Sequence, residues 1–131
     1  MEDSVCLDTD ILVDLLRDNP EVVKWIEDNK DKFEFVTTVV NVFELYSGAY
    51  KAKDGKKKIK DVEELIEKLT ILDFLIKDSK EAGRFRVILE KKGKIIDIRD
   101  LFIGTIALTN GCSLKTNNKK HFSRIEGLRV V

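Results

Sequence analysis

Short apolar runs alternate with longer segments of helical period along the chain, and this alternation constrains the fold more than any other feature. Between the runs, apolar residues recur at the three- and four-residue spacing of helices. Strands that alternate with helices are typical of a mainly parallel sheet with helices on its faces. The sequence therefore predicts one α/β domain over residues 1–131. Five runs predict the strands: residues 4–7, 33–38, 70–74, 112–115 and 128–131.

Several signals mark where the predicted helices begin, end or lie buried. Asn19-Pro20 is a typical helix start, with Asn as the N-cap and Pro at the first helical position. The charged stretch 51–58 predicts a loop, and Asp78 with Glu81 predicts a capping-box-like start. Residues 97–109 are apolar nearly all round, so we expect that helix to be buried. Another segment has apolar residues at helical spacing that predict its buried face: Val39, Val42, Phe43, Tyr46 and Tyr50.

The composition excludes several functional classes. The 24 basic residues balance 24 acidic ones, so no basic coat covers the chain and nucleic-acid binding must be local. The charge is uneven, because residues 1–34 carry eleven acids and only four bases. No apolar run reaches the roughly 18 residues of a membrane span, and the acidic start Met1-Glu2-Asp3 is no signal-peptide pattern. Cys6 and Cys112 lie in apolar segments, so we expect buried free thiols in a cytoplasmic protein.

Polar residues at the ends of the predicted strands are the first candidates for a functional site. Ligands of parallel sheets bind beyond the carboxyl ends of the strands. Asp8 directly follows the first run, Thr38 ends the second, and Thr116 and Asn118 follow the fourth. Each also has an ordinary structural explanation, since Asp8 suits an N-cap and Asn118 suits a turn.

Three further acids lie on predicted helices. Glu44 falls away from the apolar positions of its helix and has no Lys or Arg three or four residues away. An ordinary exposed glutamate would explain it equally well. Asp97 and Asp100 open the buried helix, where an N-cap and a first-turn acid are expected. A carboxylate fixed at the end of a buried helix is nevertheless held rigidly, which suits a metal site.

Taken together, these acids indicate metal chemistry. Three carboxylates from separate elements at one sheet edge would repel one another unless a cation lay among them. Oxygen ligands favour a hard ion, Mg²⁺ or Mn²⁺. Such a site hydrolyses phosphodiesters, because the ion activates water and stabilises the leaving oxygen.

The whole chain resembles a PIN domain, specifically the VapC-type ribonucleases of toxin–antitoxin pairs. The resemblance implies a three-layer α/β/α sandwich with a central, mainly parallel sheet, and a divalent-metal endoribonuclease. Four segments in order carry it: residues 5–12 (VCLDTDIL), 41–48 (NVFELYSG), 100–107 (DLFIGTIA) and 114–122 (LKTNNKKHF).

The resemblance also implies residue roles. Asp8, Glu44 and Asp100 match the acidic metal-site residues of the family. Asn118 matches the fourth position, which is Asp in many members and Asn in some. Because Asn118 is neutral, we expect one firmly held Mg²⁺ or Mn²⁺ on Asp8 and Asp100, with Glu44 orienting the attacking water. The second ion position is expected to be weak.

Other matching positions lie around these four. Asp97 is expected near the same cleft, where it could help to hold the metal. Thr38 and Thr116 match hydroxyl positions that line the site.

Partners follow from the same resemblance. We expect an RNA substrate, a small antitoxin protein that blocks the site, and a homodimer, with no membrane involved. Trp25, Tyr46 and Tyr50 lie on amphipathic helices and could contact a partner, although core packing explains them equally well. The candidate RNA contacts are Lys56, Lys57, Lys58, Lys119 and Lys120.

Other functions stay open at this point. Asp8-Thr9-Asp10 after a strand imitates the D-x-D signature of haloacid dehalogenase phosphohydrolases, although the chain is short and their later motifs are not evident. A receiver-type signalling domain has a similar length, with Asp73 as the nearest phosphoacceptor candidate. Within the PIN family, the chain could be a housekeeping RNA-processing nuclease. It could also be an idle domain that only binds RNA or protein, which the neutral Asn118 allows.

Overall fold

Four parallel strands form the sheet at the centre of the computed structural model, in the order β3-β2-β1-β4. The structure describes residues 3–131, so Met1 and Glu2 of the acidic start lie outside the described residues. The strands are β1 (Asp3–Leu7), β2 (Phe33–Thr38), β3 (Thr70–Leu72) and β4 (Ser113–Lys115). Their register pairs Leu7 with Lys115 and Thr38 with Leu72, so the strands end along one edge.

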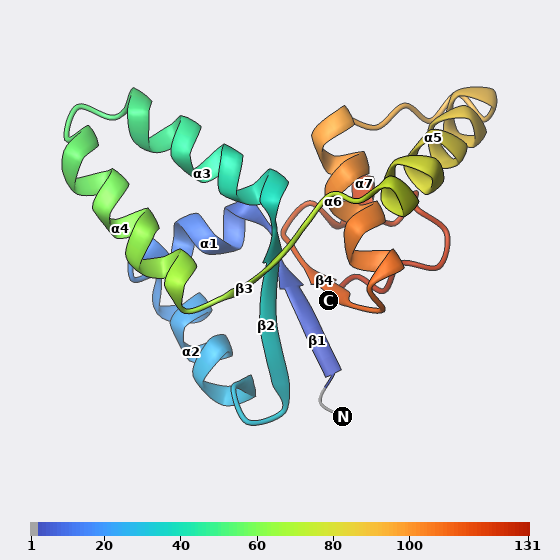
Figure 1. The fold of residues 1–131 in the computed structure, drawn as a ribbon. Coiled ribbons are helices and arrows are strands. Elements are labelled where there is room, and N and C mark those ends of the chain that lie inside the picture. The colour runs from blue at the N-terminus through green and yellow to red at the C-terminus, as the bar shows by residue number, and fades with distance from the viewer. Residues whose placement is uncertain (1–2) are drawn as a thin grey trace.

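Helices cover both faces of this sheet and complete the predicted three-layer architecture (Figure 1). One face carries α1 (Thr9–Leu16), α2 (Pro20–Asn29), α3 (Val39–Lys51) and α4 (Gly55–Glu67). The other face carries α5 (Ile76–Lys91), α6 (Ile98–Thr109) and α7 (Lys119–Phe122). None of the helices within residues 3–131 is long and apolar enough to cross a bilayer.

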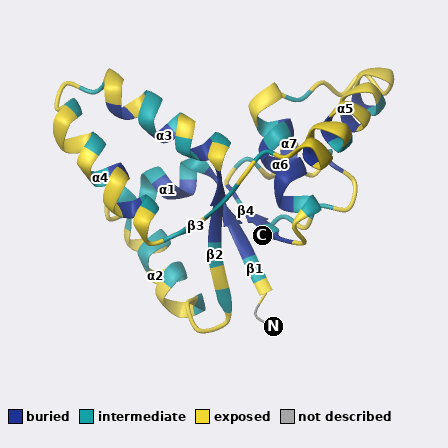
Figure 2. Cartoon of the chain, in the orientation of Figure 1, coloured by how far each residue is buried: buried dark blue, intermediate teal, exposed yellow. Residues whose placement is uncertain are grey.

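The sheet separates two hydrophobic cores. Val5 and Leu7 of β1 face the core beneath α1, α3 and α4, whereas Cys6 faces the core beneath α5 and α6. Successive residues of a strand point to opposite faces, so a strand buried on both faces is a continuous apolar run. Figure 2 shows this burial along the inner strands and α6. Cys6 and Cys112 are buried free thiols, as predicted.

Two helix predictions are confirmed in detail. The Asn19 side chain accepts hydrogen bonds from the N–H groups of Glu21 and Val22, so it caps α2 with Pro20 at the first position. Helix α6 is deeply buried, and its buried residues are Leu101, Ile103, Gly104, Thr105, Ile106 and Ala107.

Three local predictions are wrong. Residues 128–131 form no strand, because Val130 makes only an isolated bridge to Leu114. The loop predicted for residues 51–58 is shorter, since α4 already begins at Gly55. Helix α5 begins at Ile76 rather than at Asp78, whose carboxylate instead accepts the N–H of Leu75 (2.9 Å) from the third helical position.

The buried face predicted for α3 is wrong for Val39, Phe43 and Tyr50, whereas Tyr46 does pack against the core. Asn41, Leu45 and Ala49 face inward, at the i, i+4 spacing of one helical stripe. The polar Asn41 can be buried because its side chain is fully used in hydrogen bonds, whereas periodicity counts only apolar residues. The exposed apolar residues are Val39, Phe43 and Tyr50, at 39%, 60% and 76% exposure.

Candidate active site

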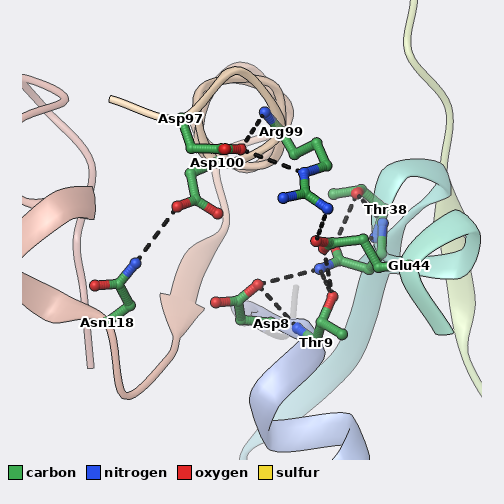
Figure 3. Close-up of polar contacts among 9 residues, drawn as sticks. Asp8, Thr9, Thr38, Glu44, Asp97, Arg99, Asp100 and Asn118 are labelled. Carbon is green, nitrogen blue, oxygen red and sulfur yellow. Dashed lines mark hydrogen bonds and ion pairs between the residues drawn. The ribbon is translucent and has the colours of Figure 1, made fainter. Parts of the chain in front are cut away.

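The carboxyl edge of the sheet brings together residues from four segments of the chain (Figure 3). Asp8 follows β1, Glu44 lies on α3, Asp100 lies in the first turn of α6, and Asn118 precedes α7. Figure 3 shows Asp8, Asp100 and Asn118 around one gap, with Glu44 beside Asp8. The convergence predicted from the strand ends is therefore present.

Asp8 is the most firmly held of these acids, with 7% of its surface exposed. Its Oδ1 accepts hydrogen bonds from the N–H of Thr9 (2.8 Å) and from Nδ2 of Asn41 (3.2 Å). Its Oδ2 accepts a hydrogen bond from the buried Thr116 hydroxyl (2.7 Å). Burial raises the pKa of Asp8, the Thr116 hydrogen bond opposes that rise, and the charge of Asp10 adds to it. Asp8 is thus both the N-cap of α1 and a fixed member of the site.

Asn41 is a site residue that the sequence analysis missed. It is fully buried, and its Nδ2 donates to Asp8 and to the Thr9 hydroxyl (2.9 Å). Its Oδ1 accepts from the N–H (3.2 Å) and hydroxyl (2.7 Å) of Thr38. Thr38 therefore acts on the site through Asn41, whereas Thr116 contacts Asp8 directly. The available signal was the capping-box spacing of Thr38 and Asn41 at the start of the helix.

Glu44 is already engaged on both carboxylate oxygens. Oε1 accepts a hydrogen bond from the Thr9 hydroxyl (2.7 Å), and Oε2 lies 3.5 Å from Nη1 of Arg99. Only 19% of its side chain is exposed, so it is not an ordinary surface glutamate. Thr9 and Arg99 are two further residues that the sequence analysis missed, and the basic residue between two acids was the available signal for Arg99.

Asp100 is partly buried among other carboxylates. Burial, followed by the charges of Asp8, Asp97 and Glu44, raises the pKa of Asp100 to about 6. The Nδ2 of Asn118 lies 3.4 Å from its Oδ2 and donates to it, which offsets little of that cost. The cluster therefore resists carrying its full negative charge in the absence of a cation.

Asp97 lies at the exposed start of α6 and is paired with a basic residue. It caps α6, and its Oδ1 accepts hydrogen bonds from the N–H (2.9 Å) and Nε (3.3 Å) of Arg99. Burial opposes its ionisation, but these bonds outweigh that effect and hold the pKa of Asp97 below its usual value. Its role as a metal ligand stays a prediction, since this oxygen serves Arg99.

The predicted lysine contacts divide into two groups. Lys119 and Lys120 are exposed in the first turn of α7, directly after Asn118. Lys56, Lys57 and Lys58 open α4, at the far end of α3 from the sheet edge (Figure 1). The fold thus places the first group next to Asn118 and leaves the second group at a distance from the site.

The donor set fits a hard divalent cation. Within residues 3–131, no three acidic, histidine or cysteine side chains are gathered closely enough to hold an ion as they stand. Asp8, Asp100 and Glu44 nevertheless supply only oxygen, the donor that Mg²⁺ and Mn²⁺ prefer. Burial, and after it the charges of neighbouring acids, raise the pKa values of Asp8 and Asp100, and a bound cation would offset both costs of the charged forms.

Family comparison identifies the chain. The family model described as "PIN domain" matches residues 5–128. This chain belongs to the PIN domain family. "Ribonuclease VapC2" of Haemophilus influenzae is 32% identical over 125 residues, 95% of this chain and 93% of the relative. "tRNA(fMet)-specific endonuclease VapC" of Shigella flexneri is 26% identical over 124 residues, with the same coverage of 95% and 93%.

Solved structures of PIN proteins give the same result. VapBC2 from Rickettsia felis, bound to a DNA fragment from its promoter, matches with a TM-score of 0.90 and 28% identity, over 97% of this chain and 96% of that chain. DNA-bound VapBC from Salmonella typhimurium matches with a TM-score of 0.89 and 26% identity, over 98% and 97%. The resemblance to VapC proteins is thus confirmed, and the phosphohydrolase and receiver alternatives are set aside.

The raised pKa of Asp100 predicts a pH-dependent change in stability. Because the folded pKa of about 6 exceeds the ordinary 3.8, the charged form costs stability above about pH 6, and this cost vanishes below about pH 4. Asp100→Asn is expected to raise the free energy of unfolding of metal-free protein by about 1 kcal/mol at pH 7.5, after discounting for solvent screening. Thermal unfolding in EDTA should show a Tm about 3 °C higher at that pH and unchanged near pH 4. A lower Tm at pH 7.5 would contradict this account.

Proposed function

We propose that this PIN domain is an endoribonuclease that hydrolyses RNA phosphodiesters with Mg²⁺ or Mn²⁺, as the toxin of a toxin–antitoxin pair. The supporting observation is the convergence of Asp8, Glu44 and Asp100 at the carboxyl edge of the sheet, in a chain whose relatives are named VapC ribonucleases. The free thiols of Cys6 and Cys112 suit the reducing cytoplasm as the place of action.

Each residue of the site has a separate role in the proposed reaction. The ion supplies a Lewis acid and an activated water when it is bound. Asp8 and Asp100 would hold it, directly or through water. Glu44 would orient the attacking water, because Thr9 fixes one of its oxygens (2.7 Å). Thr116 and Asn41 fix the two oxygens of Asp8, so that acid needs no reorganisation during the reaction.

Asn118 limits the charge of the site. Its amide stands where many family members carry an Asp, and it donates to Asp100 at 3.4 Å. A neutral side chain attracts a second cation less strongly than a carboxylate does. We therefore infer one firmly held ion, with any second ion entering together with RNA.

Cleavage of mixed cellular RNA tests the proposed function. The purified protein is incubated with this RNA in Mg²⁺, in Mn²⁺ or in EDTA. We expect discrete fragments with either ion and none in EDTA. Cleavage that persists in EDTA would refute the metal-dependent mechanism. A folded protein that cleaves nothing and binds no Mn²⁺ would indicate an idle PIN domain.

We propose that the antitoxin occupies a groove of about 190 Å³ between α1, α3 and α4. Its apolar lining includes Val13, Leu16 and Leu45, and the site residue Glu44 also lines it. A partner segment in this groove would therefore reach the site and block it. Solved relatives are VapBC complexes, which supports such a partner. Trp25, in contrast, packs on Phe35 (ring centroids 5.8 Å apart), so intramolecular packing accounts for it.

We further propose a homodimer through the outer face of α5 and the α5–α6 connection. Exposed apolar residues lie along this stretch of the chain: Ile76 (89%) at the start of α5, Val87 (49%) in its last part and Ile95 (74%) in the connection. Two cavities of about 460 and 280 Å³ lie beside this surface between α5 and α6, and Ile95 lines the larger one. Exposed apolar patches of this kind mark protein interfaces.

Light scattering checks the dimer. The wild-type mass is expected to be twice that of one chain, and Ile95→Asp is expected to give the mass of a single chain. Tyr50→Asp changes an equally exposed apolar residue (76%) at the end of α3, and should leave the dimer intact. A wild-type monomer would disprove this interface.

A further inference from the structure

Arg99 spans the top of the site between α6 and α3 (Figure 3). Its backbone N–H and its Nε both donate to Oδ1 of Asp97, at 2.9 and 3.3 Å. Its Nη1 lies 3.5 Å from Oε2 of Glu44 on the opposite element. Its side chain is 53% exposed, so a ligand at the cleft can reach it.

The two contacts of Arg99 differ in strength. The bonds to Asp97 join neighbouring residues of one helix start and restrain the side chain near its base. The ion pair with Glu44 is half-exposed, and its N···O distance of 3.5 Å is longer than that of a good hydrogen bond. Ion pairs of this kind contribute little to the stability of a protein. Glu44 also keeps its shorter bond to Thr9 if Arg99 leaves it. Arg99 can therefore exchange Glu44 for another anion while Asp97 still holds it.

The guanidinium has donors to spare for that anion. It carries five N–H groups, and the contacts within residues 3–131 use Nε and Nη1 but assign none to Nη2. In Figure 3 the remaining terminal nitrogen points toward the gap between Asp8 and Asp100. This is the gap in which the scissile phosphate would lie.

An RNA backbone approaching this gap meets several carboxylates, which repel its phosphates. Among the ion pairs of the described residues, Arg99 is the one cation in contact with this acidic cluster, through Asp97 and Glu44. A guanidinium binds a phosphate with two parallel N–H donors, in a fork that a lysine ammonium lacks.

We propose that Arg99 is a phosphate-binding residue of this site, held over the cleft by Asp97 and paired with Glu44 until RNA enters. Arg99 then touches the substrate, and Asp97 is a positioning residue that acts through Arg99. The inference rests on the proposed function, because it assigns Arg99 to the RNA of that same reaction.

Salt-dependent RNA binding tests the phosphate contact without cleavage. A fluorescent mixed-sequence 20-nucleotide RNA is titrated with protein in EDTA between 50 and 200 mM KCl. We expect Arg99→Gln to bind about 3- to 10-fold more weakly and to lower the slope of log K against log salt by about 0.7, the loss of one single-strand phosphate contact. Lys30→Gln is the matched control, since it also removes one positive charge, and Lys30 pairs with Glu27 (2.8 Å) at the end of α2 at a similar 55% exposure. Its slope should equal that of the wild type.

Cleavage kinetics and a double-mutant cycle complete the test. Arg99→Gln is expected to lower kcat/KM about 10²-fold, and Arg99→Lys to recover only part of this loss. Asp97→Asn, which keeps a capping side chain, should lower kcat/KM in the wild type and change kcat/KM little in the Arg99→Gln background.

An unchanged salt slope in Arg99→Gln would overturn the assignment of Arg99. Equal effects of Asp97→Asn in both backgrounds would overturn its positioning role. If the wild type binds no RNA, the proposed function fails and this inference fails with it.

Discussion

Asp100→Asn is expected to reduce metal-dependent RNA cleavage by about 10³-fold or more while the protein stays folded. Asp100 is held at the start of the buried helix α6, where it faces the same gap as Asp8. Its replacement by an amide removes a charge that would hold the divalent ion and keeps the volume of the side chain. Initial rates on mixed RNA in Mn²⁺ give the measurement, and Asp8→Asn should produce a comparable loss.

The matched control for this prediction is Asp28→Asn. Asp28 pairs with Lys24 (2.6 Å) on the exposed face of α2, so its loss should leave cleavage within about twofold of the wild type. Circular dichroism is the check that each variant is folded. Wild-type rates in Asp100→Asn would remove this acid from the mechanism.

Asn41→Ala is expected to lower both stability and activity. The substitution deprives the buried N–H and hydroxyl of Thr38 of their acceptor, and removes one donor to Asp8. Buried groups left without partners cost about 2–3 kcal/mol in the free energy of unfolding. A loosened Asp8 should slow cleavage about 10²-fold, as the loss of a residue that orients a metal ligand does.

Urea unfolding and cleavage rates of Asn41→Ala check this prediction, and Asn29→Ala is the control variant. Within residues 3–131, the Asn29 side chain makes one hydrogen bond, to the carbonyl of Trp25 (2.7 Å) on α2, and Figure 1 shows α2 away from the carboxyl edge of the sheet. Its loss should cost about 1 kcal/mol and leave the cleavage rate unchanged. Equal losses of cleavage in the two variants would mean that Asn41 has no special role.

The sequence alone locates two of the acids, Asp8 and Asp100, because each lies at a boundary between elements. Asp8 ends an apolar strand and Asp100 opens an apolar helix, so the rule for parallel sheets places both at one edge. Glu44 needs the family resemblance, because it lies in mid-helix and periodicity places it on the outside. The structure places it beside Thr9 instead.

The hydrogen bonds and ion pairs that support the acids cannot be predicted from the sequence. Asn41 and Arg99 acquire their roles through contacts with Asp8 and Glu44, which lie far away along the chain. Local patterns describe a helix and its cap, but not which distant side chain completes a hydrogen bond. The same limitation applies to α3, where a polar residue occupies the buried stripe.

Calorimetric titration of the metal-free protein with Mn²⁺ at pH 7.5 tests the central claim most directly. The carboxylate site predicts one bound ion in the wild type, with affinity that falls toward pH 5.5 as Asp100, of pKa about 6, becomes protonated. Asp100→Asn should bind Mn²⁺ at least about tenfold more weakly, and Asp28→Asn should bind it as the wild type does. Identical Mn²⁺ binding by the wild type and Asp100→Asn would contradict a metal-dependent site at this edge of the sheet.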